Sequence, residues 1–363
     1  MDTVTLGIVG TGAISDRYVQ AQDVYDVLEV VACGDIDEER AREKAEEHDI
    51  PKALTVEDLY ADDEVDIVLN LTPPTAHAQV TLAALEAGKH VYTEKPLAVS
   101  AADGREILDV ASEHGLMVGG APDTFLGSGL QTARAVLDEG VIGEPVGALA
   151  NWGAAGHEHW HPSPAFYYHA GGGPLFDMGP YYVTALVSLL GPVERVTGTV
   201  STPRAQREIT SEPLAGDLID VEVPTHESGL LTFENETTAT VQTSFDVPAS
   251  ELTGFELYGT EGTISLPDPN RFDEPVRVHT TDTPRGEWET IDPTHDHPGH
   301  RGLGVVDMAY ALQTDWDQRA SGALTAHVLE ILESVRDSSE TGTHVDLSAD
   351  CTQPDPLPRT FLS

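Results

Sequence analysis

The first 120 residues alternate short apolar runs with helical patterns, and this alternation limits the fold more than any other feature of the sequence. The apolar runs are 3–9, 28–33, 67–71, 90–93 and 117–120. Helical patterns lie between them and begin near residues 13, 37, 76 and 101. Strands that alternate with helices form a parallel sheet. We therefore expect a doubly wound α/β domain over residues 1–122.

The pattern changes after about residue 125. A helix is expected at 129–139, and strand-like runs then follow at 193–200, 218–223, 229–233, 237–245, 251–258 and 263–266. Successive strands without helices between them form an antiparallel sheet. Further helices are expected at 181–190 and 324–336, before a Pro-rich tail that we expect to return over the first domain. Residues 123–363 thus predict an α+β domain with a large, mostly antiparallel, open-faced sheet.

A glycine-rich turn follows the first strand and opens the first helix. It has the pattern G-x-G-x-x-S, with Gly10, Gly12, Ala13, Ile14 and Ser15. The first glycine makes the turn, the second lets the backbone approach a pyrophosphate, and the small serine keeps helix and strand close. The helix N-terminus adds N–H groups for the phosphates. This context predicts a dinucleotide-binding Rossmann domain.

Asp35 ends the second strand, where an acid hydrogen-bonds the ribose hydroxyls of NAD and repels the 2′-phosphate of NADP. We therefore expect NAD to be preferred. Arg40 and Arg42 follow closely and offer the alternative of a 2′-phosphate site, so NADP stays open. Asp35 and Asp37 could instead cap the next helix.

Two further loops follow strands of the same sheet. Ligands bind at the carboxyl ends of such strands, and the candidate cofactor contacts are Thr72, Pro73, Pro74, His77, Glu94, Lys95 and Pro96. Lys95 is one of only four lysines in the chain, which suggests a chemical role. An ion pair with Glu94 is the alternative.

These motifs, together with Gly171-Gly172-Gly173-x-x-x-Asp177, resemble in order and spacing the Gfo/Idh/MocA family of glucose-fructose oxidoreductase and inositol dehydrogenase relatives. The resemblance covers nearly the whole chain. It implies an NAD(P)-dependent oxidoreductase without a metal, in which Lys95 lies at the nicotinamide and the substrate. It also implies that Asp177 belongs to the catalytic group, with a histidine four residues later.

That histidine is absent, because Tyr181 occupies its position. Asp177 and Tyr181 still share one helix face, since residues four apart are neighbours. We expect Tyr181 to exchange a proton with the substrate beside a lysine, although it could simply be a packed aromatic residue. His159 and His161 are alternative bases or substrate contacts. A metal site in this histidine-rich segment is not expected.

Asp123 follows the last strand of the first domain, and we expect it to bind substrate hydroxyls. A helix or turn cap is the alternative for this residue.

The charge is extreme, with 62 acidic residues against 19 basic ones and a net charge of -43. Such self-repulsion is tolerated where concentrated salt screens it. We therefore expect a protein of a salt-loving organism. Nucleic acids and membranes are excluded as partners, because they require Lys/Arg patches.

Two distant cysteines, Cys33 and Cys351, do not suggest a disulfide framework, and the chain has no signal-like or transmembrane-length segment. A cytoplasmic location is expected. The open sheet face suggests a homo-oligomer, a dimer or a tetramer. The sequence thus predicts a dehydrogenase for a secondary alcohol or carbonyl of a sugar, polyol or similar molecule. The alternative is a noncatalytic NAD(P)-binding regulator of the same fold.

Overall fold

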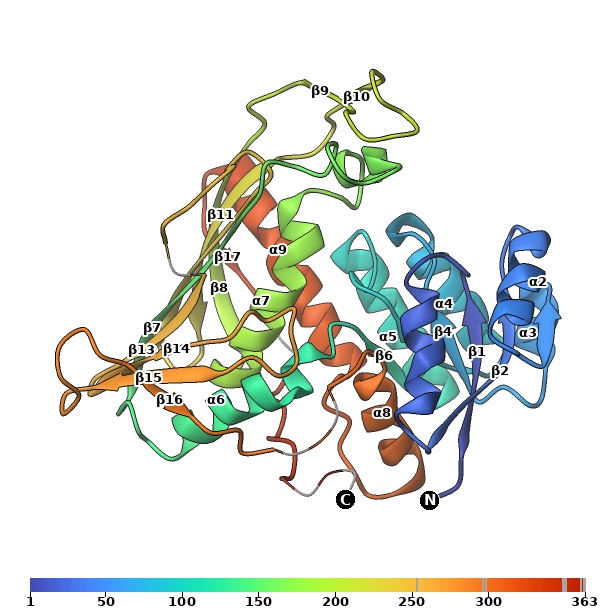
Figure 1. Ribbon diagram of the computed structural model, residues 1–363, viewed down its shortest axis with the longest axis horizontal. Coiled ribbons are helices and arrows are strands. Elements are labelled where there is room, and N and C mark those ends of the chain that lie inside the picture. Colours follow the sequence, from blue (N-terminus) through green and yellow to red (C-terminus); the bar gives the residue numbers. More distant parts are fainter. Residues whose placement is uncertain (253, 296, 298, 348–350, 360, 362–363) are drawn as a thin grey trace. The chain divides into compact units, whose positions relative to one another are not determined.

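The computed structural model describes residues 1–252, 254–295, 297, 299–347, 351–359 and 361 (Figure 1). Contacts divide the chain into two compact units, Met1–Leu126 with Pro298–Leu329, and Gly127–His297 with Glu330–Ser363. The segment 298–329 was expected in the second domain but packs in the first unit. The helix in this segment, α8 (Leu303–Gln313), is capped by Asp123. The backbone N–H of Gly120 donates to the carbonyl of Ala320 at 3.1 Å.

The first unit contains a six-stranded sheet in which every pair of neighbours is parallel. In spatial order the strands are β3 (Lys52–Leu54), β2 (Leu28–Gly34), β1 (Val4–Val9), β4 (Ile67–Asn70), β5 (His90–Thr93) and β6 (Val118–Gly120). All four residues of β4 are buried. Helices cover both faces of a parallel sheet, which explains why its central strands are mostly apolar.

Two helices of this unit show clear capping residues. Asp37 caps α2 by accepting from two backbone amides, and Ser100 caps α5, which ends at the left-handed Gly115. The helices are α1 (Ser15–Val19), α2 (Glu38–Glu47), α3 (Val56–Ala61), α4 (His77–Glu86), α5 (Ala101–His114) and α8 (Leu303–Gln313). Single turns lie at η1 (Gln20–Asp23), η2 (Pro74–Ala76) and η3 (Thr124–Leu126).

The second unit contains a nine-stranded sheet that is antiparallel except between β7 and β12. In spatial order its strands are β16 (Glu289–Ile291), β15 (Val276–Thr280), β14 (Gly262–Ser265), β13 (Phe255–Gly259), β7 (Pro145–Gly153), β12 (Thr238–Ser244), β11 (His226–Phe233), β8 (Val193–Ser201) and β17 (Val345–Asp346). A separate hairpin pairs β9 (Gln206–Glu208) with β10 (Leu218–Asp220). The predicted fold class is confirmed in both units.

Helices pack on one face of the second sheet. The helices that contribute to this unit are α6 (Ser128–Asp138), α7 (Pro174–Leu190), the turn η4 (Pro164–Tyr168) and part of α9 (Gly322–Thr341). α7 packs against β12, β11 and β7. Gly198 and Gly229 pair across β8 and β11, and a side chain at either position would collide with Val335 of α9. Along β12 buried and exposed residues alternate, as expected for a sheet with one open face.

The described part of the tail packs on the second unit. Leu357 donates its N–H to Gln131 of α6 at 2.7 Å, and the carbonyl of Pro354 accepts from Arg134 at 3.0 Å. Residues 348–350, 360 and 362–363 of the tail, and residue 253 of the strand expected at 251–258, lie outside the described residues. Among the described residues, no helix combines the length and apolar character needed to span a bilayer.

Candidate active site

The loop between β1 and α1 has the geometry that the glycine pattern predicts. Gly10 has a φ of 97°, and a Cβ atom there would lie 2.8 Å from the backbone of Leu71. The hydroxyl of buried Ser15 donates to the carbonyl of Gly12 at 2.6 Å. A Cβ at Gly12 would meet no described atom within 4 Å. The loop therefore leaves its own backbone accessible. Ala13 is exposed, and Ile14 is half-buried.

Asp35 lies at the end of β2 with both carboxylate oxygens engaged. One oxygen accepts from the backbone N–H and hydroxyl of Thr11, and the other accepts from Asp37 N–H and from the Arg40 guanidinium at 2.5 Å. Burial alone would raise the pKa of Asp35, but the hydrogen bonds from Arg40, Asp37 and Thr11 outweigh it and lower the pKa. Arg40 is half-exposed, whereas Arg42 pairs with two glutamates of its own helix.

The loops after β4 and β5 are joined by His77. One ring nitrogen of His77 lies 2.6 Å from the carbonyl of Pro96 and the other 2.7 Å from that of Thr72. Asn70, buried at the end of β4, donates to the backbone of His77 and accepts from the Thr72 hydroxyl. The side chain of His77 is fully buried between the two loops, which it holds together, and its contact with the cofactor stays a prediction. Pro73, in the same loop, is exposed.

Pro74 is half-buried and begins η2, which leads directly into α4. Proline suits the first position of a helical turn, where the missing N–H would have no partner. The residue therefore sets the direction in which the chain leaves this loop.

Glu94 holds the loop that carries Lys95. One Glu94 oxygen accepts from the hydroxyl of Tyr18 at 2.9 Å, and the other accepts from the backbone N–H of Lys95 at 3.1 Å. Tyr18 is buried, and burial raises its pKa well above the usual value, so it stays a donor. Glu94 therefore fixes the backbone from which the half-buried Lys95 extends.

Asp123 has a structural role that differs from the predicted substrate contact. Its side chain is fully buried, and one oxygen accepts from the backbone N–H groups of Gly302 and Gly304 at 2.8 and 3.2 Å. Arg301 lies 3.4 Å away. Burial raises the pKa of Asp123. The cap that was the alternative interpretation is therefore what the structure shows, at the N-terminus of α8.

Glycines allow the chain to enter α7 closely against η4. A Cβ at Gly172 would lie 2.6 Å from carbonyl oxygens of η4, and Gly173, with a φ of 95°, donates its N–H to Tyr167 at 2.7 Å. The helix begins at Pro174, earlier than expected, so Pro180 lies inside it and not in its first turn. Fifteen residues of α7 are buried, and this packing offsets the hydrogen bond that Pro180 removes.

Asp177 and Tyr181 lie one turn apart on α7, as the spacing predicts. Tyr181 is buried and Asp177 is partly buried. One oxygen of Asp177 lies 3.1 Å from Nε2 of His157, which is also buried. Of the three alternating histidines, His157 is thus one that lies within hydrogen-bonding distance of Asp177, although the sequence singled out His159 and His161.

The other two histidines face different surroundings. His159 is exposed. His161 is half-buried, makes edge contacts with the rings of Trp160 and Phe166, and accepts from the backbone N–H of Ser163 at 3.0 Å. Burial lowers the pKa of His161.

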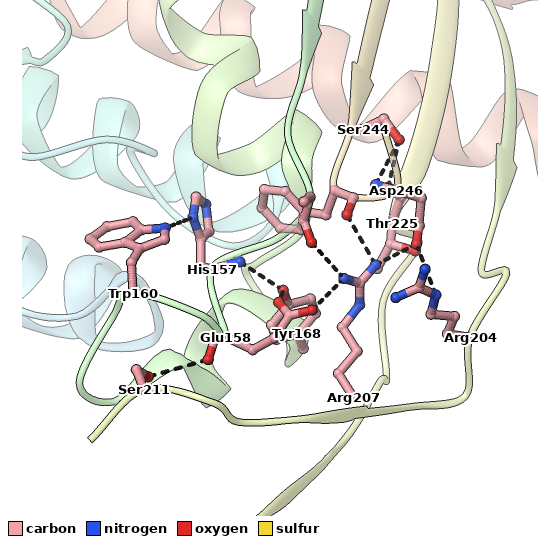
Figure 2. Close-up of polar contacts among 12 residues, drawn as sticks. His157, Glu158, Trp160, Tyr168, Arg204, Arg207, Ser211, Thr225, Ser244 and Asp246 are labelled. Carbon is pink, nitrogen blue, oxygen red and sulfur yellow. Dashed lines mark hydrogen bonds and ion pairs between the residues drawn. The ribbon is translucent and has the colours of Figure 1, made fainter. Parts of the chain in front are cut away.

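A network of buried charged residues lies next to His157 (Figure 2). Arg207 of β9 donates to Glu158 at 2.7 Å and also pairs with Asp246. The Tyr168 hydroxyl donates to Glu158 and accepts from the backbone N–H of His157 at 3.1 Å. Burial alone would raise the pKa of Glu158, but the bonds from Tyr168 and Arg207 lower it. Glu158 therefore stays ionised, and the network fixes the backbone at His157.

One group of potential metal ligands is present among the described residues, namely Asp16, Glu47 and His48. The ammonium of Lys44 already donates to both Asp16 and Glu47. A metal cation at this position would therefore compete with the Lys44 ammonium for the same carboxylates.

Both parts of the chain match one family. Residues 4–120 match the family described as an oxidoreductase family with an NAD-binding Rossmann fold, and residues 130–265 match the GFO/IDH/MocA C-terminal domain. The chain belongs to the Gfo/Idh/MocA oxidoreductase family. The resemblance inferred from the motifs is thereby confirmed, and residues 1–122 include an NAD(P)-binding Rossmann domain of this family.

Two relatives match over most of their length. The chain is 28% identical to D-xylose 1-dehydrogenase (NADP(+)) 2 of Haloferax volcanii, covering 94% of this chain and 99% of the relative. It is 29% identical to inositol 2-dehydrogenase 3 of Saccharopolyspora erythraea, covering 94% and 87%. The apo form of levoglucosan dehydrogenase has the same fold, with a TM-score of 0.83 at 20% identity and coverage of 97% and 100%.

The residues of this Gfo/Idh/MocA member fit a dinucleotide. The open space beside Gly12 suits a pyrophosphate, and Asp35 and Arg40 lie where the ribose or its 2′-phosphate is recognised. The sequence did not single out Thr11, Tyr18, Asn70 or His157 as supporting residues. Thr11 lies between the two glycines, Asn70 begins the loop stretch that ends at His77, and His157 lies in the histidine cluster, so these three lay in motifs that could have indicated them.

Proposed function

We propose that this protein is an NAD(P)-dependent dehydrogenase that transfers hydride between nicotinamide and a secondary alcohol or carbonyl of a sugar, polyol or related molecule. The observation that carries the proposal is the pair on α7, where Asp177 and Tyr181 lie one turn apart and His157 holds the Asp177 carboxylate. An acid held beside a tyrosine suits proton exchange with a hydroxyl group.

The names of the relatives support this substrate class. The two relatives that match over most of their length are named for D-xylose and inositol, and both compounds carry the secondary alcohols that such a reaction oxidises. The xylose enzyme comes from Haloferax volcanii and is named as NADP-dependent, which keeps NADP open for this chain.

Each catalytic residue has a separate task in the proposed reaction. The Lys95 ammonium polarises the substrate oxygen, Tyr181 accepts or returns the hydroxyl proton, and Asp177 orients the reacting groups. The bound nicotinamide supplies the hydride chemistry. Glu94 and His77 keep the Lys95 loop in place through their bonds to its backbone.

The expectations of an NAD preference, a homo-oligomer and a cytoplasmic location stay predictions. The open face of the nine-stranded sheet supports an oligomer, since it exposes Leu230 by 47%. His159 and His161 stay proposed substrate contacts, because both lie on the segment that begins at His157 and is anchored there to Asp177.

The test is reduction of NAD and of NADP by a panel of aldoses, polyols and inositols in molar KCl. We expect turnover with at least one sugar or polyol, measured by the absorbance of the reduced nicotinamide. If calorimetry shows cofactor binding while no compound of the panel is oxidised, and no matching ketone is reduced, the chain is the noncatalytic regulator. Tyr181 in place of the family histidine is what favours that second function.

A further inference from the structure

Both ring nitrogens of His157 are engaged. Nε2 lies 3.1 Å from an oxygen of Asp177. Nδ1 lies 3.1 Å from the indole nitrogen of Trp160, a contact drawn in Figure 2. The ring is buried against Tyr167 and Phe245, with ring centres 4.1 and 4.7 Å away. The contacts therefore leave this imidazole one orientation.

The partner on Nδ1 determines where the proton of His157 lies. An indole N–H is a donor only, so Nδ1 must be the unprotonated acceptor. The ring proton then lies on Nε2, from which it is donated to the carboxylate of Asp177. A neutral imidazole in this tautomer is a donor to Asp177 and has no free lone pair with which to accept a substrate proton.

The backbone of the segment is fixed as well as the ring. Tyr168 accepts from the N–H of His157, and Glu158 is held by both Tyr168 and the buried Arg207. Arg207 is anchored in turn by Asp246. These bonds fix the backbone of His157 and Glu158. The imidazole of His157 therefore extends towards Asp177 from a fixed point of the chain.

We propose that His157 is a positioning residue, which donates its Nε2–H to Asp177, and that Trp160 holds it in this tautomer. The proposal rests on the proposed function, because it assigns to Asp177 the orientation of the reacting groups. A carboxylate that accepts a fixed hydrogen bond keeps one orientation, and catalysis is sensitive to displacements of about 1 Å. His157 thus acts through Asp177, and proton transfer belongs to another group.

Two replacements of His157 in the full chain separate positioning from proton transfer. H157Q keeps an N–H donor near the position of Nε2 but cannot carry a proton, whereas H157F keeps the aromatic contacts and has no donor. We expect H157F to lower kcat by about 10²-fold with an unchanged KM for the cofactor. H157Q should recover most of that loss. If H157Q is as slow as H157F while both stay folded by circular dichroism and bind cofactor, His157 transfers the proton and the proposal is wrong.

A second measurement does not depend on turnover. Nitrogen-15 NMR of the histidine rings, with the His157 signals identified by their loss in H157Q, should show a protonated Nε2 and an unprotonated Nδ1. Trp160→Phe removes the indole N–H and should give a mixture of tautomers. Trp152→Phe is the matched control, because this ring also lies near His157, with ring centres 6.4 Å apart. This variant should keep the tautomer of the parent protein.

The two measurements separate the proposal from the proposed function. A proton on Nδ1 of the parent protein would overturn the proposal even if sugars were oxidised. The expected tautomer together with no turnover of any sugar or polyol would support the bond to Asp177 and contradict only the proposed function.

Discussion

Asp35 is the residue whose surroundings bear most directly on the choice of cofactor. An acid at this position favours NAD when its oxygens are open to the ribose hydroxyls. Here Thr11, Asp37 and Arg40 already donate to both oxygens, and the Arg40 guanidinium is half-exposed. We infer that Arg40 controls the selectivity between NAD and NADP. Its positive charge neutralises the Asp35 carboxylate, which would otherwise repel a 2′-phosphate.

Replacing Arg40 by alanine should therefore weaken NADP binding relative to NAD. The loss of one charge-assisted hydrogen bond corresponds to a change of about 10- to 100-fold in the ratio of the two dissociation constants. Titration of both cofactors in molar KCl measures that ratio. Arg42→Ala is the matched control on the same helix, and a change of the ratio in this variant alone would assign the role to Arg42.

His327 of α9 makes stability depend on pH. Burial lowers the pKa of His327 to about 4, from a usual value of 6.5. Below pH 6.5 the unfolded chain binds a proton at this residue that the folded chain does not, so stability falls as the pH drops towards 4 and then levels off. The loss should be on the order of 3 kcal/mol.

His327→Gln removes this titration, so denaturant unfolding of the variant should lose less stability than the parent between these two pH values. The exposed His114→Gln is the control and should behave as the parent does. Parallel curves for the parent and the His327 variant would contradict the assignment.

At the scale of elements, local patterns predicted most of the first unit. β5 has the predicted bounds and α5 begins at the predicted residue because their signals are local, an apolar run for the strand and a Ser100 cap with Gly115 for the helix. α8 was missed because its N-terminal partner, Asp123, lies far away in the sequence. β7 was missed because its sequence is rich in Gly and Ala, and only its pairing with β12 and β13 makes it a strand.

α7 shows why the candidate site was predicted only in part. The i,i+4 spacing correctly placed Asp177 and Tyr181 on one helix, but the first turn depends on distant residues. Glu227 of β11 accepts from the N–H of Leu175, and Arg336 of α9 donates to Glu227. His157 was not chosen because three alternating histidines look equivalent in the sequence, and only the packing distinguishes the one that meets Asp177.

At the scale of the whole molecule, the net charge of -43 is the dominant property. Lys44 pairs with Asp16, Lys52 pairs with Asp62, and Lys89 donates to two backbone carbonyls. Acidic residues far outnumber basic ones, so their carboxylates repel one another over the surface. Salt screens this repulsion.

We therefore expect the midpoint of thermal unfolding to rise steeply between dilute buffer and molar KCl, with activity following it. Calorimetry over a series of KCl concentrations measures the midpoint. Sodium chloride at matched ionic strength is the control for a specific effect of potassium. Full thermal stability in dilute buffer would show that the acidic surface needs no screening.

The central claim assigns one reaction to Lys95, Asp177 and Tyr181, and the kcat of the Tyr181→Phe variant tests it most directly. We predict that kcat falls by about 10² to 10⁴-fold with cofactor affinity retained, the usual contribution of a positioned acid or base. Lys95→Met should be at least as damaging, and the double variant little worse than either, because groups that act together are disabled by the loss of one. A Tyr181→Phe variant with near-parental kcat, beside an inactive His161→Ala or His159→Ala, would contradict the claim.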